Sequence, residues 1–283
     1  MTATPDPVFD RPIFIVSTPR SGSTLLFETL ARARGVFTIG GESHQLIESI
    51  PQLTIRARGF SSNRLVAEDA VPTVVAELRR RFHANMRDRD GNELPLGHGR
   101  FRMLEKTPKN SLRIPFLLEA FPEALFVFLY RDPRQVLASM IEAWLSGRFK
   151  TYVGLPGWPM PYWALLLTPE WQALAGKPLA EVVAGQWKAA TEILLDDLAT
   201  LPPGRCQTIR YGEFIADPAA GIGRLCAGLG LAWDRPLDGP LPVARHTVTR
   251  PDPEKWRARG TEIETVMPGL LATIERAERA VGA

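Results

Sequence analysis

The feature that most constrains this chain is an apolar run that leads into a polar loop and then into a helical pattern. Residues 13–17 predict a strand, and leucines at helical spacing predict a helix over residues 23–33. The first amides of a helix have no partner within it, and the helix dipole favours negative charge there. The connecting loop adds the charge of Arg20, the close backbone approach that Gly22 allows, and the hydroxyls of Ser21, Ser23 and Thr24. The sequence therefore predicts a cradle for a phosphate group.

A second strand-to-helix junction carries another anion-binding pair. Residues 124–130 predict a buried strand that leads to Arg131, and Asp132 followed by Pro133 favours the start of a helix over residues 133–146. Ser139 lies about two turns past the N-cap, so it returns to the face on which the helix begins. Arg131 and Ser139 are therefore predicted to hold one phosphate together.

These two motifs resemble those of sulfotransferases that use 3′-phosphoadenosine 5′-phosphosulfate (PAPS). The loop Thr18-Pro-Arg-Ser-Gly-Ser-Thr24 resembles the family's 5′-phosphosulfate loop, and Arg131 with Ser139 is similar to its 3′-phosphate site. The resemblance covers residues 12–260 and implies an α/β, P-loop-like three-layer fold with a central, mostly parallel sheet flanked by helices. It also implies PAPS as cofactor, adenosine 3′,5′-bisphosphate as product, and a hydroxyl of a small-molecule, lipid or natural-product acceptor as substrate.

Sulfuryl transfer needs cations that neutralise charge growing on the leaving phosphate. Arg20 is the first predicted cation, and the tyrosylprotein sulfotransferases, which this loop resembles most, also carry arginine there. Lys106 is the second, because it ends a predicted strand that begins at Phe101, where the resemblance implies a lysine near the sulfate. The alternative for Lys106 is an ordinary solvated lysine.

The transfer also needs a base for the acceptor proton, and Glu42 is the predicted base. Many cytosolic members of the family have a histidine after the third strand, but residues 105–108 contain none. Glu42 instead matches the glutamate that follows the second strand in the tyrosylprotein enzymes. His44 is the rival, since a neutral imidazole has a suitable pKa, and Glu42 could also be a first-turn acid stabilised by a helix dipole. Glu105 is expected to pair with a basic neighbour.

The C-terminal third supplies two cofactor contacts that the resemblance implies. The segment from Arg210 to Pro218 resembles the family segment whose tyrosine meets the adenine, which points to Tyr211. Residues 255–260 resemble the basic loop that closes on the 3′-phosphate, within which Arg257 is the preferred ligand and Arg259 the second. A half-buried tyrosine and a simple basic loop are the alternatives.

Helical and strand patterns alternate along the 283 residues, of which 45% are hydrophobic, so we expect one domain over residues 1–283. Residues 1–11 are expected to form an N-terminal arm. Residues 147–177 are rich in Pro and Gly and contain three tryptophans. We expect this insert to cover the core, to form one wall of the acceptor site, or to do both. Such an insert looks like that of bacterial sulfotransferases linked to natural-product or lipid modification. The other predicted elements are strands at 36–39 and 206–211, helices at 43–50, 65–87, 110–120, 178–199 and 261–280, and short helices after Asp217-Pro218.

Charge and cysteine content narrow the function classes. A net charge of +3 is too small to favour nucleic acid, yet it suits an anionic cofactor. Cys206 and Cys226 are expected to be ordinary thiols of a cytoplasmic protein, and no spacing of His, Cys, Asp or Glu predicts a metal site. The sequence contains no apolar run of about 20 residues that could span a membrane. Its first residues show no basic segment followed by an apolar one, so no signal peptide is expected.

Two rival functions remain at this stage. One is a P-loop nucleotide kinase, against which the missing GxxxxGK[ST] spacing counts, because Arg20 stands where those enzymes carry Gly-Lys. The other is a catalytically silent nucleotide-binding module. Glu42 and Lys106 speak against such a module, since mere binding needs neither of them.

Overall fold

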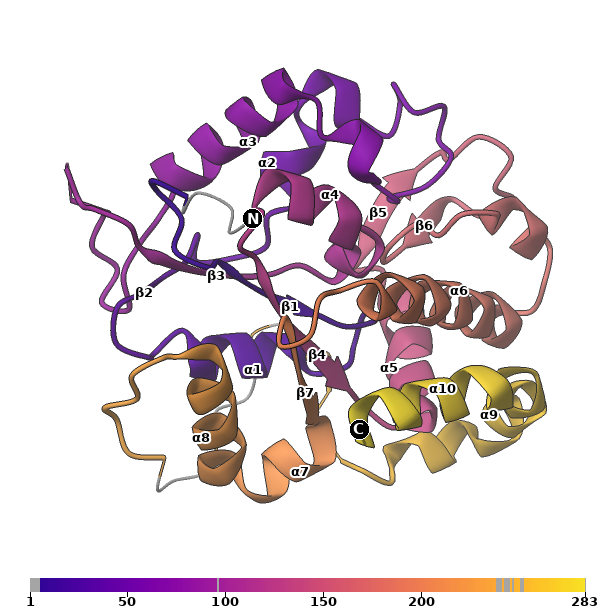
Figure 1. Cartoon of the computed structure of the whole chain (residues 1–283). Helices are drawn as coiled ribbons and strands as arrows, with labels where there is room; N and C mark the ends of the chain where they lie inside the picture. The colour runs from indigo at the N-terminus through magenta and orange to yellow at the C-terminus, as the bar shows by residue number, and fades with distance from the viewer. Residues whose placement is uncertain are drawn as a thin grey trace.

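A five-stranded sheet runs through the middle of the molecule in a computed structural model of the chain (Figure 1). The structure describes residues 6–95, 97–237, 241, 245, 247–249 and 252–282. Neighbouring strands of this sheet are all parallel, in the spatial order β2-β3-β1-β4-β7. They are β1 (Ile13–Val16), β2 (Val36–Phe37), β3 (Arg102–Lys106), β4 (Leu125–Tyr130) and β7 (Cys206–Arg210).

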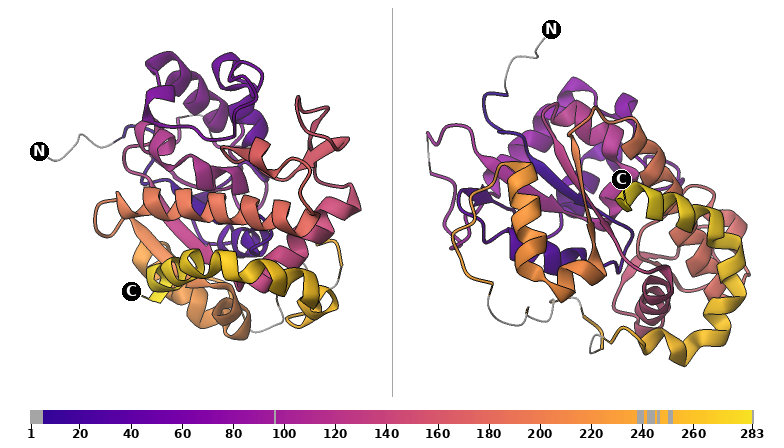
Figure 2. Two further views of the ribbon diagram at one scale, coloured as in Figure 1. Left: turned by 90° about the vertical axis from the view of Figure 1, so that its right-hand side faces the viewer. Right: turned by 60° about the horizontal axis from the view of Figure 1, so that its bottom comes forward.

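Both faces of the sheet are covered because side chains alternate along each strand. In β1, Ile13 and Ile15 pack on one face, while Phe14 and Val16 pack on the other. Figures 1 and 2 show helices above and below the sheet, which confirms the expected three-layer, P-loop-like α/β fold. The first face is covered by α1 (Ser23–Leu30) and α8 (Pro218–Leu229), and the second by α3 (Pro72–Ala84), α4 (Ile114–Ala120), α6 (Leu179–Ala199) and α10 (Leu271–Gly282).

Helix α5 (Pro133–Ser146) begins just after β4 and has the predicted bounds. The Asp132 carboxylate accepts a hydrogen bond from the amide of Gln135 at 3.1 Å, and Pro133 occupies the first helical position. The chain then forms a small antiparallel hairpin of β5 (Lys150–Val153) and β6 (Tyr162–Ala164) beside the main sheet.

The tryptophans of the insert are buried in an aromatic cluster. Trp158, Trp163 and Trp171 pack with Trp144 of α5 and Trp187 of α6, and none of the five is more than 8% exposed. The ring centroids of Trp158 and Trp163 lie 4.7 Å apart at an interplanar angle of 69°. The insert is therefore a packed layer joined to α5 and α6.

Two prolines set boundaries that apolar spacing alone misplaces. Helix α3 begins at Pro72 and not near residue 65, because proline favours the first helical position and holds the residue before it extended. The helix expected over residues 261–280 is divided at a 3₁₀ turn that contains Pro268, whose ring removes a backbone donor.

The remaining elements are short. Helix α7 was not predicted, and Tyr211 opens it instead of ending a strand. Residues 1–5 of the expected N-terminal arm lie outside the described residues, and Phe9 packs on the rings of Phe101 and Phe121. The short elements are α2 (His44–Glu48), α7 (Tyr211–Ala216), α9 (Gly260–Val266) and the 3₁₀ helices η1 (Pro51–Leu53), η2 (Ala67–Asp69), η3 (Pro108–Leu112), η4 (Trp171–Leu174), η5 (Lys255–Arg259) and η6 (Met267–Leu270).

The carboxyl ends of the parallel strands share one edge of the sheet, which is where ligands bind in folds of this kind. The polar segments that the sequence singled out lie at this edge. Arg20 follows β1, Glu42 follows β2, and Lys106 ends β3. Arg131 follows β4, and Tyr211 follows β7.

Candidate active site

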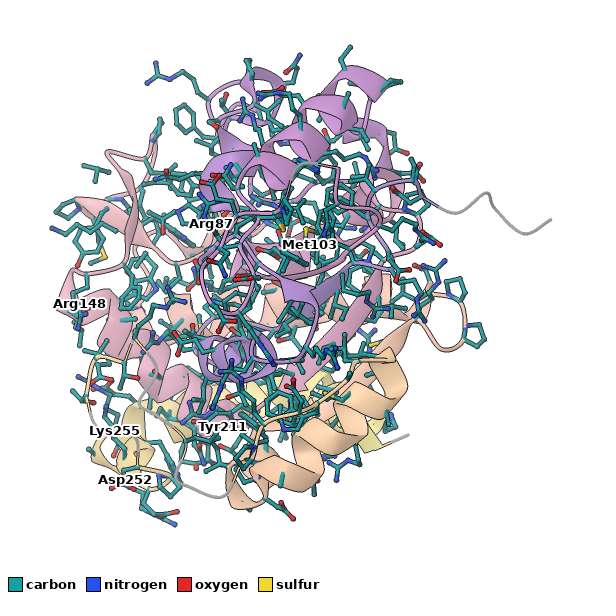
Figure 3. All side chains as sticks on the ribbon, turned by 90° about the vertical axis from the view of Figure 1, so that its left-hand side faces the viewer. Arg87, Met103, Arg148, Tyr211, Asp252 and Lys255 are labelled. Atoms are coloured by element: carbon teal, nitrogen blue, oxygen red, sulfur yellow. The ribbon has the colours of Figure 1, made fainter. Side chains whose placement is uncertain are left out.

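A cavity of about 950 Å³ opens at this edge of the sheet. Its walls come from the loop after β1, from α2 and α5, from the hairpin β5–β6, and from the C-terminal loop that includes Lys255. Figure 3 shows Arg148, Tyr211 and Lys255 on one side of the molecule around this region. Ligand sites usually measure roughly 300–1,000 Å³, so the cavity has room for two small ligands.

The loop after β1 turns tightly against Tyr211. Gly22 has φ +95°, and a Cβ atom at this position would lie 2.2 Å from Cε2 of the tyrosine ring. Helix α1 begins at the next residue, and Ser23 and Thr24 line the cavity. The loop therefore presents the unpaired amides of a helix start together with two hydroxyl groups.

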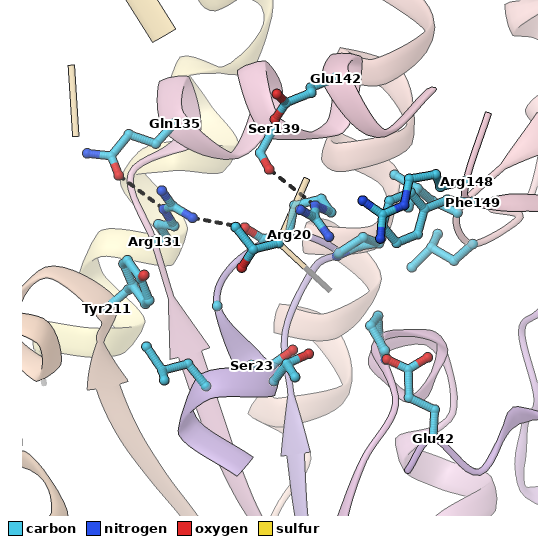
Figure 4. A pocket seen from close by; sticks show the side chains of 18 of the residues that line it. Arg20, Ser23, Glu42, Arg131, Gln135, Ser139, Glu142, Arg148, Phe149 and Tyr211 are labelled. Carbon is cyan, nitrogen blue, oxygen red and sulfur yellow. Dashed lines mark hydrogen bonds between the residues drawn. The ribbon is translucent and has the colours of Figure 1, made fainter. Parts of the chain in front are cut away.

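Arg131 and Arg20 lie next to one another along the cavity wall (Figure 4). Arg131 donates from Nε to Oε1 of Gln135 at 3.0 Å and from Nη1 to the backbone oxygen of Arg20 at 3.2 Å. Its guanidinium also lies 4.5 Å from the ring centroid of Tyr211. Arg20 donates from Nε to Oγ of Ser139 at 3.1 Å. Ser139 thus faces the cavity as predicted, but its direct partner is Arg20 and not Arg131.

Positive charge converges on Arg20. Burial lowers the pKa of its guanidinium, the nearby Glu142 carboxylate opposes this effect, and the charges of Arg131 and Arg148 lower the pKa further. The backbone at Arg20 has φ +69°, in the left-handed region that residues other than glycine seldom adopt. Several guanidinium groups that face one cavity form a site for an anion.

Lys106 links the loop to Glu42. Its Nζ donates to Oε1 of Glu42 at 2.6 Å and to Oγ1 of Thr24 at 3.1 Å. The lysine side chain is only 3% exposed, so it is not a solvated surface residue. A charge in this position acts on both the phosphate cradle and the neighbouring carboxylate.

The two candidate bases lie together. Nδ1 of His44 is 3.7 Å from Oε2 of Glu42. Burial would raise the pKa of Glu42, but the nearby His44 and the charge of Lys106 outweigh burial and hold this pKa at about 2. Glu42 is therefore an ionised carboxylate at neutral pH.

Glu105 anchors the turn that carries Glu42. The Glu105 side chain is fully buried, and its Oε1 accepts hydrogen bonds from Oγ1 of Thr107 at 2.5 Å and from the amide of Ser43 at 3.3 Å. Its Oε2 accepts from Nδ2 of Asn110 at 2.6 Å. Burial raises the pKa of the Glu105 carboxyl. The backbone that follows Glu42 is thus fixed by a buried polar network.

One expectation about a neighbouring residue was wrong. Among the described residues, Glu105 forms no ion pair with a basic neighbour such as Lys106, because adjacent residues of a strand point to opposite faces of the sheet. The Ser21 hydroxyl lies 2.9 Å from that of Thr18 and is not among the side chains that line the cavity.

The C-terminal loop also differs from the expectation. Arg257 pairs with Glu254, lies 4.9 Å from the ring centroid of Trp256, and is not among the residues that line the cavity. Lys255 lines it instead, and its Nζ donates to both oxygens of Glu142 at 2.8 and 2.7 Å. The structure therefore brings Lys255, and not Arg257, to the site.

A buried ion-pair group that the sequence did not reveal lies at the end of α2. The Glu48 carboxylate accepts hydrogen bonds from Nζ of Lys109 at 2.7 Å and from Nη2 of Arg113 at 2.5 Å. Nζ of Lys109 also donates a hydrogen bond to the Tyr152 hydroxyl at 3.3 Å. Burial would raise the pKa of Glu48, but these two cations lower it. Only the position of Lys109, just after the strand that ends in Lys106, could have hinted at this group.

The insert contributes to the cavity as well as to the core. Phe149, Leu165 and Leu166 line the cavity, and the Arg20 guanidinium lies 4.9 Å from the ring centroid of Phe149. Arg148 lines the same wall. The insert therefore supplies apolar side chains and one guanidinium to the side of the site beyond Arg20.

Over the described ranges, no group of three or more His, Cys, Asp or Glu side chains could hold a metal ion. None of the helices in this part of the chain is both long and apolar enough to cross a membrane. Cys206 and Cys226 are free thiols, and burial raises the pKa of each to about 11.

The parallel sheet, the glycine-bearing loop and the cavity at the carboxyl edge of the sheet define a P-loop-like α/β protein with a cationic cavity. A family model described as "Sulfotransferase family" matches residues 12–235. The chain belongs to the sulfotransferase family.

Individual relatives agree with this assignment. Protein-tyrosine sulfotransferase A of Caenorhabditis elegans is 24% identical over 226 residues, which are 78% of this chain and 50% of that protein. Nodulation protein NoeE of Sinorhizobium fredii (strain NBRC 101917 / NGR234) is 26% identical over 235 residues, 77% of this chain and 49% of that protein. This chain therefore spans about half the length of both relatives.

A solved structure is similar over almost its whole length. The sulfotransferase from Alicyclobacillus acidocaldarius aligns over 96% of both chains with a TM-score of 0.50 and 16% identity. At this identity the match bears on the fold alone.

Proposed function

We propose that this protein transfers a sulfuryl group from PAPS to a hydroxyl group of a small-molecule, lipid or natural-product acceptor. The observation that carries the proposal is the pair of anion sites in one cavity, centred on Arg131 and on Arg20. They lie at the ends of neighbouring parallel strands, and the loop that carries Arg20 leads into the unpaired amides of α1.

The residues of the cavity fit a nucleotide with two separate anionic groups. Arg131 would hold the 3′-phosphate, with Ser139 nearby, and Tyr211 would meet the adenine beside it. Arg20, Ser23 and Thr24 would surround the phosphosulfate. When bound, this donor supplies the sulfuryl group. Lys255 is the cation of the C-terminal loop that faces the cavity, and we propose it in place of Arg257 as a further phosphate contact.

Glu42 is the proposed base. Lys106 holds Oε1 of its carboxylate, which leaves Oε2 to accept the hydroxyl proton. A carboxylate with a pKa of about 2 is a weak base. The negative charge of the donor would attract the ammonium group of Lys106, whose Nζ already donates a hydrogen bond to Thr24 in the donor loop. The attraction between Lys106 and Glu42 would then weaken, and the pKa of Glu42 would rise when the donor is bound.

Arg20 and Lys106 also supply the positive charge that a kinase obtains from Mg²⁺ and its P-loop lysine. The acceptor would lie beyond Arg20, between α2 and the apolar side chains Phe149, Leu165 and Leu166. The proposal thus assigns the insert as one wall of the acceptor site.

Calorimetric titration with adenosine 3′,5′-bisphosphate, AMP and ATP tests the donor assignment. We expect the bisphosphate to bind about 10- to 100-fold more tightly than AMP, since each charge-assisted hydrogen bond is worth about 1.5–3 kcal/mol. Arg131→Ala should remove most of this difference. Arg134→Ala is the matched control, because Arg134 lies three residues later, in the first turn of α5, but pairs with Glu264. Preference for ATP would overturn the assignment and favour a kinase.

A further inference from the structure

Arg148 is a cation of the cavity wall that the proposed donor does not require. It follows α5 directly, and in Figure 4 it lies beside Phe149, on the side of Arg20 away from Arg131. Arg148 is close enough to Arg20 for its charge to lower the pKa of that guanidinium, after the larger effect of burial. Among the residues that the structure describes, no carboxylate forms an ion pair with Arg148.

The surrounding side chains do not balance this charge. Lys150, two residues later, also lines the cavity, and its Nζ lies 5.1 Å from the ring centroid of Tyr162, without an ion pair to any described carboxylate. Glu48 is the acid on the facing helix α2, and it is shared between Lys109 and Arg113.

The other three acids of the cavity lie with other partners. Glu42 pairs with Lys106, and Glu142 pairs with Lys255. Asp252 belongs to the C-terminal loop, where its Oδ1 accepts a hydrogen bond from the amide of Glu254 at 2.8 Å. The side of the cavity beyond Arg20 therefore carries excess positive charge that the donor does not need for binding. The cations there are Arg148, Lys150 and Lys109.

The same side of the cavity is apolar between these cations. Phe149, Leu165 and Leu166 line it, and Leu165 and Leu166 pack into the hydrophobic clusters beneath the cavity wall. A cationic rim with apolar walls suits a molecule that has a hydrocarbon or aromatic body and a negatively charged group.

We propose that the acceptor is an anionic amphipathic hydroxyl compound, whose carboxylate or comparable anionic group is bound by Arg148 with the support of Lys150. This inference rests on the proposed function and names the class of acceptor for it. The hydroxyl end would face Glu42 across the cavity, and the apolar body would contact Phe149 and Leu165. Arg148 acts here as a specificity-determining residue, and its partner is the acceptor and not the donor.

Matched pairs of acceptors test this inference. The probes are 4-hydroxyphenylacetate against 4-hydroxyphenylacetamide, and 10-hydroxydecanoate against 10-hydroxydecanamide. The members of each pair have nearly the same shape and differ in charge. Binding of each probe to protein saturated with adenosine 3′,5′-bisphosphate is measured by calorimetry, and ³⁵S transfer from labelled PAPS is measured in parallel.

The variants are Arg148→Gln, Lys150→Gln and, as a matched control, Arg56→Gln, since Arg56 is exposed and does not line the cavity. In the unmodified protein, the carboxylate of at least one pair should bind about tenfold more tightly than its amide, because charge-assisted hydrogen bonds are roughly twice as strong as neutral ones. Arg148→Gln should remove most of this preference, Lys150→Gln part of it, and Arg56→Gln none. The dissociation constant of PAPS should not change in Arg148→Gln.

Three results would overturn the inference. In the first, both carboxylates bind no more tightly than their amides. In the second, the preference for the carboxylate survives in Arg148→Gln. In the third, Arg148→Gln loses as much affinity for PAPS as for the acceptor. The last result would assign Arg148 to the donor. Failure of the proposed function gives a different pattern, in which the carboxylate preference is present and depends on Arg148 but no ³⁵S is transferred.

Discussion

Replacement of Glu42 by glutamine tests the electrostatic arrangement at the centre of the site. The pKa of Glu42 falls from 4.5 to about 2 in the folded protein, because His44 and Lys106 outweigh the effect of burial. Each pKa unit corresponds to about 1.4 kcal/mol. The ionised Glu42 carboxylate therefore contributes about 3 kcal/mol to the free energy of unfolding at pH 7 relative to its protonated form.

The sign and the pH range follow from the direction of this shift. A depressed pKa stabilises the folded protein above the pKa of the unfolded chain, and the contribution is lost as the pH falls toward about 2. At pH 3.5, about 2 kcal/mol of the contribution should remain. Glu42→Gln cannot ionise, so its deficit in stability should be about 1 kcal/mol smaller at pH 3.5 than at pH 7.

Urea unfolding of both proteins at the two pH values measures this change. Glu68→Gln is the control, since Glu68 is an exposed glutamate of the 3₁₀ helix η2. Its stability relative to the unmodified protein should be the same at both pH values. A deficit of Glu42→Gln that stays constant, or that grows as the pH falls, would refute the reasoning.

Two further predictions concern turnover, measured as ³⁵S transfer from PAPS to a responding extract of metabolites, and one concerns the affinity for adenosine 3′,5′-bisphosphate, measured by calorimetry. Glu42→Gln should lower kcat by about 10²- to 10⁴-fold, the usual contribution of general-base catalysis, while His44→Gln should cost far less. Gly22→Ala should weaken binding of adenosine 3′,5′-bisphosphate, because a Cβ atom would lie 2.2 Å from Cε2 of Tyr211 and the backbone at residue 22 has φ +95°. EDTA should leave turnover unchanged, since Arg20 supplies charge without a metal.

Each of these predictions has an outcome that contradicts it. Normal turnover in Glu42→Gln together with an inactive His44→Gln would move the base to His44, and normal turnover in both would place the base elsewhere. Unchanged affinity in Gly22→Ala would mean that Tyr211 can move away from the loop at no cost. Loss of turnover in EDTA that Mg²⁺ restores would favour a kinase.

The two strand-to-helix junctions could be predicted because their signals are local. The sequence around Gly22 specifies its own turn and the start of α1, and Asp132 with Pro133 specifies the start of α5. Parallel strands then bring both junctions to one edge of the sheet. These features need no knowledge of how distant segments pack.

Other parts of the site depend on packing between distant segments. The ion pairs of Glu48 with Lys109 and Arg113 join residues more than sixty positions apart, so no short pattern contains them. The choice of Lys255 over Arg257 depends on how the 3₁₀ helix η5 is rotated against α5. Neither periodicity nor charge fixes such a rotation.

Two misjudged features could have been foreseen from the sequence. Strand alternation already separates Glu105 from Lys106, because neighbours in a strand point to opposite faces. The boundary at Pro72 follows from the restriction that proline places on the preceding residue. In both cases the backbone geometry, and not the apolar or charged character of the neighbouring residues, decides the structure.

The central claim is that this site transfers a sulfuryl group and not a phosphoryl group. The most direct test incubates the protein with the same extract of metabolites and either ³⁵S-labelled PAPS or ATP labelled with ³²P at the γ-position. We predict that ³⁵S enters acceptor molecules while adenosine 3′,5′-bisphosphate is released in equal amount, and that no ³²P is transferred. Transfer of ³²P without ³⁵S would contradict the account in favour of a kinase, and transfer of neither label would favour a catalytically silent nucleotide-binding module.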